Sequence, residues 1–238
     1  MTEGDVDIAA VAALLADRTR ARMLTALAGG VALPAGELAR TAGVSAGTAS
    51  QHLAKLVAAD WLAVERHGRH RYYRIDRPDV LNVVESLAKV APVREVRSLS
   101  GARLNDSLRL ALTCYDHLAG ALGVAVFDAL SDQGALEKPE GTWQAGADAT
   151  VMDRLGIHLP DDAVRRRRPA VRACLDWSQR RHHLAGWLGA AVLRRMIEQR
   201  WCERVRGNRS VQVTDTGWRE LDRALGIAQG QVLQAVKR

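Results

Sequence analysis

Two short stretches in the second half of the chain repeat one combination of chemically active side chains. In each stretch a cysteine is followed two residues later by an aspartate, and a histidine stands directly before Leu-Ala-Gly. The residues are Cys114, Asp116 and His117 in the first stretch and Cys174, Asp176 and His183 in the second. Thiolate, imidazole and carboxylate groups together suit a zinc-like or softer metal ion. If the two stretches pack against each other, these side chains form a candidate effector or metal site.

A purely structural interpretation competes with this one. Cysteine is often buried as a small apolar residue, and we expect Cys114 and Cys174 on apolar helical faces. The histidines would then only form hydrogen bonds in the core. With Cys202 the cysteines are three in number and widely spaced, so they do not form a disulfide framework. A cysteine-dependent enzyme is a remote alternative, because Cys114 and His117 on one helix lack a third orienting group. We expect no enzyme activity.

A second chemically distinctive stretch is a run of cations around Gly68. Strand-like runs at 62–66 and 70–75 flank this glycine and predict a β-hairpin. Its cationic side chains are Arg66, His67, Arg69, His70, Arg71 and Arg74. A hairpin with this charge suits DNA, where it lies along phosphates or enters the minor groove.

The stretch before the hairpin predicts an amphipathic helix from Ser45 to about Ala59. Its apolar face holds Ala49, Leu53 and Leu56, and its polar face holds Thr48, Gln51, His52 and Lys55. Glutamine can pair with adenine, and lysine can contact guanine or phosphate. The hydroxyls of Ser45 and Thr48 lie near the helix N-terminus, where phosphate binds favourably.

Other elements must position this helix and hairpin. The pattern predicts helices over 5–16 and 17–28, the latter capped by Asp17. A short helix over 35–41 ends at Gly43, and a further helix begins at residue 79. The order is that of a helix-turn-helix followed by a β-hairpin wing.

Three segments in this order resemble the ArsR/SmtB family of bacterial repressors. They are 15–24, 44–56 with its "VSAGTASQHLAKL", and the wing at 65–75. The resemblance covers residues 5–97 and implies a winged helix that binds double-stranded DNA. The implied DNA contacts are Ser45, Gly47, Thr48, Ser50, Gln51, His52, Lys55, Arg66, Arg69, His70, Arg71 and Tyr72.

The resemblance also implies a homodimer, formed by the first helix and the helix over 79–91. An apolar stripe on the latter consists of Val80, Val83, Leu87 and Val90. A two-fold dimer would bind an inverted-repeat operator. The family's metal positions do not carry over, because 37–42 contains no cysteine and 79–85 no histidine.

Composition sets the remaining bounds. Of the residues 47% are hydrophobic, mostly leucine, alanine and valine, which favours a helical, packed protein. The net charge of +7 suits a polyanionic partner. Neither a signal peptide nor a membrane-spanning run is apparent, so we expect a cytoplasmic protein without membrane contact.

The second half, 103–238, is expected to be a helical sensor domain. The segments 117–125 and 183–191 repeat each other, each with a Gly-x-x-Gly spacing, and 201–209 resembles the wing. We therefore predict that 183–238 ends the chain as a degenerate winged-helix-like unit. Besides a metal ion, a small organic effector in an apolar pocket is a candidate ligand; no cofactor is evident. Tryptophans available to line the pocket are Trp143, Trp177, Trp187, Trp201 and Trp218.

These observations predict a mainly α fold with small β-hairpin wings. The function that they favour is a dimeric, sequence-specific transcription repressor that an unknown effector releases from DNA. The alternative is a Cys/His metal- or redox-responsive sensor whose winged helix also makes protein contacts.

Overall fold

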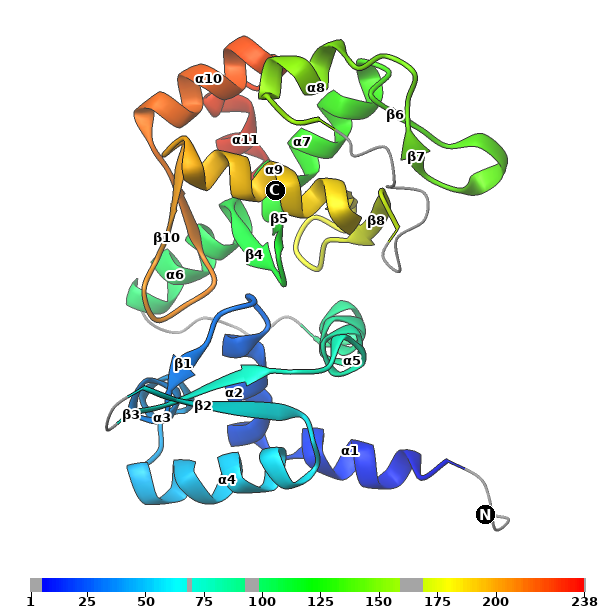
Figure 1. Cartoon of the computed structure of the whole chain (residues 1–238). Helices are drawn as coiled ribbons and strands as arrows, with labels where there is room; N and C mark the ends of the chain where they lie inside the picture. The colour runs from blue at the N-terminus through cyan, green and yellow to red at the C-terminus, as the bar shows by residue number, and fades with distance from the viewer. Residues whose placement is uncertain (1–5, 68–69, 93–98, 159–168, 238) are drawn as a thin grey trace. The chain divides into compact units, whose positions relative to one another are not determined.

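The computed structural model describes residues 6–67, 70–92, 99–158 and 169–237. The chain divides into two compact units, 1–87 and 88–238, and each is described by itself (Figure 1). Both consist of helices and short antiparallel hairpins, which confirms the predicted fold class. In the described residues, no helix is long and apolar enough to cross a membrane.

The first unit has the predicted order of helices and strands. Its elements are α1 (Ile8–Ala16), α2 (Arg18–Leu27), β1 (Leu33–Pro34), α3 (Ala35–Ala42), α4 (Ala46–Ala58), β2 (Leu62–His67), β3 (His70–Ile75) and α5 (Pro78–Val90). The strands form one antiparallel sheet in the order β1-β3-β2. This arrangement is a winged helix with β2 and β3 as its wing.

Side-chain caps fix the start of this unit. The Asp17 carboxylate accepts a hydrogen bond from the Arg20 backbone N–H at 2.9 Å, which confirms the predicted cap of α2. The nearly buried Arg20 guanidinium donates to the carbonyls of Ala13 and Leu14 at the end of α1. One arginine thus satisfies two carbonyls that α1 itself leaves without partners.

The second unit contains more hairpins than the sequence analysis predicted. Its elements are α6 (Leu99–Leu110), β4 (Leu112–Cys114), β5 (His117–Ala119), α7 (Gly120–Asp132), β6 (Leu136–Glu137), the 3-10 helix η1 (Pro139–Gly141), β7 (Gln144–Ala145), α8 (Thr150–Leu155), β8 (Arg172–Leu175), β9 (His182–Ala185), α9 (Gly186–Glu198), β10 (Cys202–Arg204), β11 (Val211–Val213), α10 (Asp215–Leu225) and α11 (Gln229–Val236). Helix α6 begins at Leu99, between the two segments 5–97 and 103–238 that the sequence analysis distinguished.

The internal repeat has a clear structural counterpart. Each copy is a short hairpin that runs directly into a long helix, β4-β5-α7 and β8-β9-α9. The expectation that Cys114 and Cys174 lie on helical faces is therefore wrong, because both lie on strands. In the first copy Tyr115 has a φ of 60°, which closes the chain into a tight turn where a helix would need negative φ.

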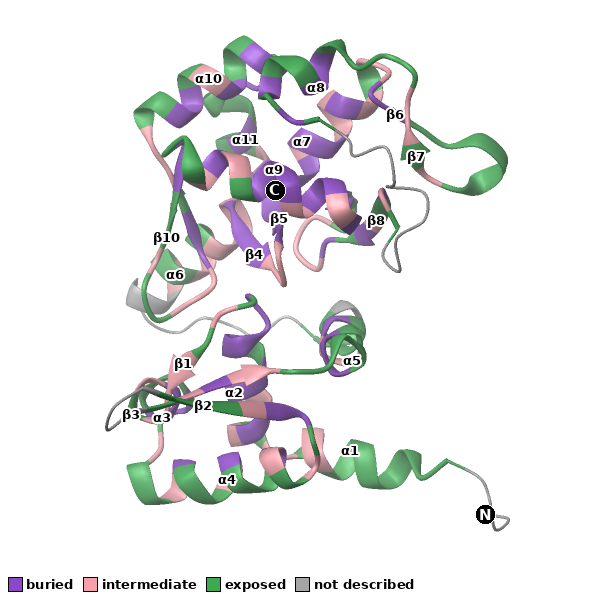
Figure 2. Cartoon of the chain, viewed as in Figure 1, coloured by how far each residue is buried: buried purple, intermediate pink, exposed green. Residues whose placement is uncertain are grey.

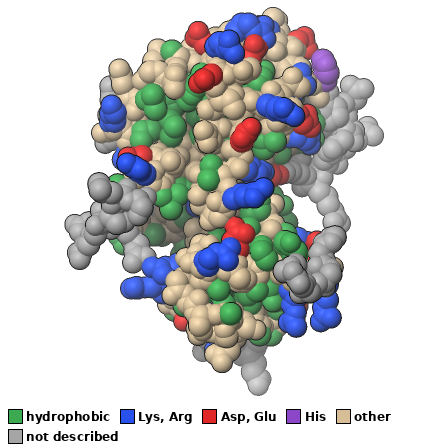
Figure 3. Space-filling view, turned by 90° about the vertical axis from the view of Figure 1, so that its left-hand side faces the viewer, with side chains coloured by type: hydrophobic (Ala, Val, Ile, Leu, Met, Phe, Trp, Pro, Cys, Tyr) green, Lys and Arg blue, Asp and Glu red, His purple; other side chains and the backbone are tan. Residues whose placement is uncertain are grey.

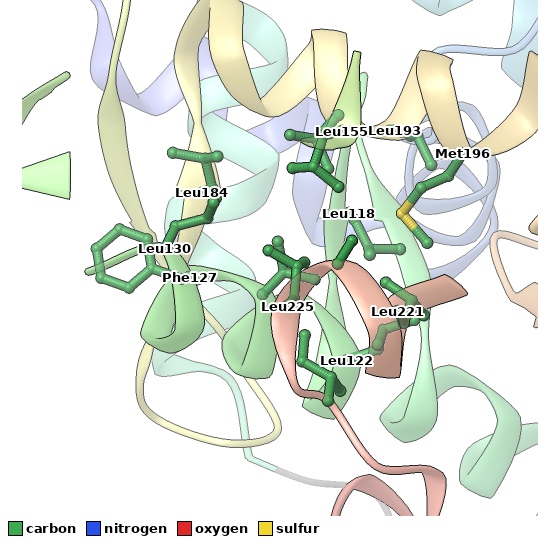
Figure 4. Packing of buried hydrophobic residues seen from close by; sticks show 14 of the residues in the cluster. Leu118, Leu122, Phe127, Leu130, Leu155, Leu184, Leu193, Met196, Leu221 and Leu225 are labelled. Carbon is green, nitrogen blue, oxygen red and sulfur yellow. The ribbon is translucent and has the colours of Figure 1, made fainter. Parts of the chain in front are cut away.

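The two copies share one hydrophobic core. Leu118 and Leu122 of the first copy and Leu184 and Leu193 of the second belong to the same buried cluster. Figure 4 shows these side chains together with those of α10, which confirms one continuous core rather than two separate ones. Helix α9, the β10-β11 hairpin and α10 follow the helix-hairpin-helix order expected for 183–238, and α11 ends the unit. A bridge between Leu112 and Ser210 joins that hairpin to β4.

Candidate functional sites

The turn between α3 and α4 sets up the candidate recognition helix. Gly43 has a φ of 72°, and its N–H bonds back to α3, which ends that helix in the left-handed conformation that glycine adopts readily. Ser45 then caps α4, because its hydroxyl accepts from the Thr48 N–H at 3.2 Å. Both the predicted stop at Gly43 and the predicted cap at Ser45 are confirmed.

Helix α4 presents the two expected faces. Ala49, Leu53 and Leu56 are at most 1% exposed and belong to the core of the first unit. Thr48 and His52 are half-buried, and the exposed residues proposed as DNA contacts are Ser45, Gly47, Ser50, Gln51 and Lys55. The core fixes the helix while the outer face stays accessible.

His52 differs from its neighbours on this face. Its Nδ1 lies 3.4 Å from the Asp17 carboxylate, at the start of α2. The pKa of Asp17 is lowered, chiefly because the Arg20 backbone N–H donates to it and to a lesser extent because of His52. The His52 ring is therefore positioned by a contact inside the unit, which the sequence pattern did not reveal.

The wing carries a cross-strand pair of like charges. Arg66 of β2 stands opposite Arg71 of β3, and both are exposed. In the described part of the chain neither has an acidic partner, whereas Arg74 binds Glu65 at 2.8 Å and also contacts Asp76. These carboxylates raise the pKa of Arg74. Among the wing side chains that the structure describes, Arg66 and Arg71 are thus cations with no acidic partner.

The other wing residues named from the sequence differ in position. Arg69 lies outside the described residues, and for His70 the structure gives only its backbone pairing with His67. Tyr72 is half-buried beside Pro34 of β1.

The residues expected at a dimer interface fall into two groups. Val80 is 4% exposed and packs into the core of its own unit, so it offers little surface to a second copy of the chain. Val83 is half-buried, while Leu87 and Val90 are 45% and 79% exposed. The apolar stripe rotates out of the core toward the end of α5.

Helix α1 has no buried residue at all. Val6 and Ile8, at its start, are 72% and 71% exposed, and Val11 is 39% exposed. Figure 2 shows α1 exposed along most of its length. This is the other helix that the sequence analysis assigned to a dimer interface.

In the second unit, the two repeats bring their cysteines and histidines together. Cys114 stands opposite His117 across the β4-β5 hairpin, and Cys174 stands opposite His183 across β8-β9. One ligand atom from each of the four lies within 4.8 Å of all the others. We refer to these four residues as the thiol–imidazole cluster. His182, which directly precedes His183 in the chain, is exposed and lies outside the cluster.

Two glycines allow this approach. A Cβ on Gly123 would lie 3.5 Å from the Cβ of His183, and a Cβ on Gly189 would lie 3.1 Å from that of His117. The same Cβ atoms would collide with the carbonyl oxygens of Leu118 and Leu184. The repeated Gly-x-x-Gly spacing therefore serves close packing of each helix on the other copy's histidine.

A carboxylate stands behind each imidazole. Asp116 Oδ1 lies 3.4 Å from Nδ1 of His117, and Asp176 Oδ2 lies 3.5 Å from Nδ1 of His183. Asp176 is 1% exposed and also accepts a hydrogen bond from the Gly120 N–H at 2.7 Å, at the start of α7. The structure therefore brings all six sequence-selected residues into one place.

The cysteines of this unit differ in their electrostatics. The pKa of Cys174 is well below its usual value, because a hydrogen bond with Cys114 and, to a lesser extent, those with the two imidazoles outweigh burial. Burial raises the pKa of Cys202 to about 12. Cys174 thus has the character of a metal-binding thiol, and Cys202 that of a core residue.

A cavity of about 350 Å³ is a separate candidate for an organic effector. It lies between α7, α11 and the residues before β9, and it contains the Asp128–Arg181 ion pair. No tryptophan lines it. Trp201 and Trp218 are instead buried in the core, with Trp143 and Trp187 packed against it.

The positive charge of the chain is widely spread. On the face seen in Figure 3, lysine and arginine side chains alternate with acidic and hydrophobic ones. Overall charge therefore does not single out one part of the surface in that view.

Comparisons with known proteins agree with this geometry. Residues 15–65 match the family described as "Helix-turn-helix domain". The "Uncharacterized HTH-type transcriptional regulator YdfF" of Bacillus subtilis (strain 168) is 41% identical over 222 residues, which cover 93% of this chain and 98% of that protein. This match extends through both units.

Solved structures match about a third of the chain. A predicted DNA-binding transcriptional regulator from E. coli is 30% identical, with a TM-score of 0.33, over 35% of this chain and 88% of that one. The AntR antimony-specific transcriptional repressor is 32% identical, with a TM-score of 0.30, over 35% of this chain and 84% of that one. On the helix-turn-helix match and the relative spanning both units, the chain belongs to the HTH-type transcriptional regulators.

Proposed function

We propose that this regulator is a homodimeric, sequence-specific repressor that binds an inverted-repeat operator and responds to an effector held by its second unit. The observation that carries the proposal is the juxtaposition of α4, with its exposed polar face, and a wing whose Arg66 and Arg71 face each other. Helix α4 would enter the major groove, and the wing would contact the flanking backbone.

The arginine pair argues for a polyanionic partner. Like charges placed directly opposite on adjacent strands destabilise a hairpin. In the described part of the chain no carboxylate relieves Arg66 or Arg71, because Glu65 and Asp76 bind Arg74 instead. DNA phosphates would supply the missing counter-charge.

The exposed apolar residues support a dimer. Val6, which precedes α1, Ile8 of α1, and Leu87 and Val90 of α5 are apolar side chains that stay exposed to water when the chain is alone. A second copy of the chain is the occupant we propose for these surfaces, because two-fold dimers bury the same patch on both subunits. Sedimentation of the full chain would show a dimer, and I8E would shift it toward monomer.

The test of DNA recognition is a fluorescence-anisotropy titration with the duplex upstream of the protein's own gene. Wild-type protein should bind this duplex more tightly than a random duplex of equal length. Gln51→Ala should change the preference among duplexes, because glutamine contacts base edges. Gln199→Ala, which replaces the cap residue at the end of α9, is the control and should leave the preference among duplexes unchanged.

Equal affinity of the wild-type protein for both duplexes at every salt concentration would contradict recognition of that operator. A Q51A preference identical to that of wild type would contradict the assignment of α4 as the recognition helix.

The cavity beside Asp128 and Arg181 supports a second candidate effector, a small polar organic molecule. An effector of this kind would bind equally well to variants of the thiol–imidazole cluster. This property distinguishes such an organic effector from a metal ion bound by the cluster.

A further inference from the structure

We propose that the thiol–imidazole cluster binds one divalent metal ion of the zinc class in a closed tetrahedral site. The ligands are the Sγ atoms of Cys114 and Cys174 and the Nε2 atoms of His117 and His183. This inference concerns the second unit alone and does not depend on the proposed DNA function.

The set of donors selects the class of metal. Two thiolates and two imidazoles suit zinc and softer ions, whereas magnesium and calcium require oxygen ligands. The metal replaces the thiol protons, and two thiolates then balance the charge of the dication. Four protein ligands complete a tetrahedral shell and leave no position for substrate, as in structural zinc sites.

The spacing of the two imidazoles fits such a shell. Nε2 of His117 lies 3.2 Å from Nε2 of His183. With metal–nitrogen bonds of about 2.0–2.1 Å, a tetrahedron requires its nitrogen ligands to be about 3.3–3.4 Å apart. The two nitrogens therefore already stand almost at the separation of two ligands.

Proton counting supports a cation between these nitrogens. The carboxylates of Asp116 and Asp176 face Nδ1 of His117 and His183 and favour a proton on each Nδ1. A neutral imidazole with a proton on Nδ1 has only a lone pair on Nε2. Two lone pairs would then face each other at 3.2 Å inside the protein, and a metal ion converts this repulsion into two bonds.

The carboxylates of Asp116 and Asp176 lie on the side of each imidazole that faces away from the proposed metal ion. Metal-bound histidines commonly donate their other ring N–H to a carboxylate, which fixes the ring orientation. Asp176 is itself held in place, because Oδ1 accepts from the Ser178 and Gln179 backbone N–H groups at 2.8 and 2.9 Å. The carboxylate of Asp176 is therefore fixed with its Oδ2 3.5 Å from Nδ1 of His183.

Burial and connectivity give the site its role. His117, Cys174 and His183 are each at most 2% exposed. Each repeat supplies one cysteine and one histidine, so a single ion ties the two hairpins together. Because the ion binds the folded arrangement, loading should stabilise the second unit against unfolding.

The experiment uses the full chain, stripped of metal by a chelator under reducing conditions. Co²⁺ is added as a spectroscopic probe, followed by Zn²⁺ in competition. We expect one Co²⁺ per chain, with the intense visible bands of a tetrahedral ion and thiolate charge-transfer absorption, and displacement by one equivalent of Zn²⁺. Thermal unfolding should shift upward on loading.

Matched variants assign the ligands. Cys174→Ser and His117→Gln should each lose the tetrahedral spectrum. Cys202→Ser replaces a cysteine of the same unit outside the cluster, and His158→Gln replaces an exposed histidine, so both should retain it. Circular dichroism of each metal-free variant checks that it is folded. If C174S does not fold, the folded H117Q variant provides the test of the ligand assignment.

Three results would overturn the proposal. They are the absence of Co²⁺ binding by the reduced wild-type protein, an octahedral spectrum, and equal binding by folded C174S or H117Q. Anisotropy with DNA, run in parallel, reports separately on the proposed repressor function.

Discussion

The wing hairpin and the two repeat hairpins use the same backbone pairing for opposite purposes. In the wing, the cross-strand pair Arg66–Arg71 faces solvent with no acidic partner within the described residues. In the β4-β5 hairpin the pair Cys114–His117 faces the other repeat, where the imidazole is 2% exposed. A cross-strand pair at the surface can recognise a ligand that comes from outside, whereas a buried pair needs a second hairpin to complete its site.

The largest effect expected from a test of this contrast is on the packing of the repeats. Gly189→Ala places a Cβ 2.4 Å from the Leu184 carbonyl oxygen and 3.1 Å from the His117 Cβ. We expect a loss of about 1–3 kcal/mol in the free energy of unfolding, because the backbone must move. Urea denaturation of the full chain measures it.

The control for this substitution is Gly230→Ala in α11, where nothing lies within 4 Å of the new Cβ. This variant should be as stable as the wild type or more stable by up to about 1 kcal/mol, since alanine favours a helix. Equal stabilities of the two variants would show that the repeats do not require close contact at Gly189.

The next effect concerns the outer shell of the proposed metal site. Asp116→Asn keeps the size of the side chain but removes the charge behind His117. We expect metal affinity to fall by roughly 10- to 100-fold, as is typical of such groups. Competition with a chromophoric chelator measures the change. Asp153→Asn, beside the exposed His158, should leave the affinity unaltered.

The wing is tested by removing its two unpaired cations. R66A/R71A should weaken binding to every duplex and reduce the slope of log affinity against log salt by about 2, since each phosphate contact contributes roughly 0.9. Arg77→Ala removes a cation that contacts Asp79 beyond the wing and is the control. An unchanged slope in R66A/R71A would exclude the wing from the interface.

The smallest effect separates stability from function. Arg71→Glu places opposite charges across the hairpin in place of like ones. We expect the free energy of unfolding without DNA to rise by roughly 0.2–1 kcal/mol, while DNA binding is lost. Arg71→Gln should lie between wild type and R71E in stability. A loss of stability in R71E would mean that the arginine pair is not repulsive in the free protein.

Local signals made the first unit predictable. The stop at Gly43 and the caps at Ser45 and Asp17 each depend on residues within four positions along the chain. The apolar spacing of Ala49, Leu53 and Leu56 marked the buried face of α4 correctly. Family resemblance added the dimer stripe, but it did not reveal that Val80 belongs to the chain's own core.

The second unit was harder to predict because its strands are very short. A three-residue strand such as β4 has too few positions to show alternation, and the spacing of Cys114 and His117 also fits one turn of a helix. The left-handed turn at Tyr115 decided the outcome, and no glycine or asparagine marked it in the sequence.

The sequence by itself therefore determined the winged helix, its basic hairpin and the identity of the six residues that combine thiol, imidazole and carboxylate groups. Only the tertiary structure decided that these six converge and that Arg74, unlike Arg66 and Arg71, is neutralised within the wing. The physical reason is the range of the interactions. Caps and amphipathic faces arise from neighbours along the chain, whereas the cluster joins residues some sixty positions apart through a core that both repeats build together.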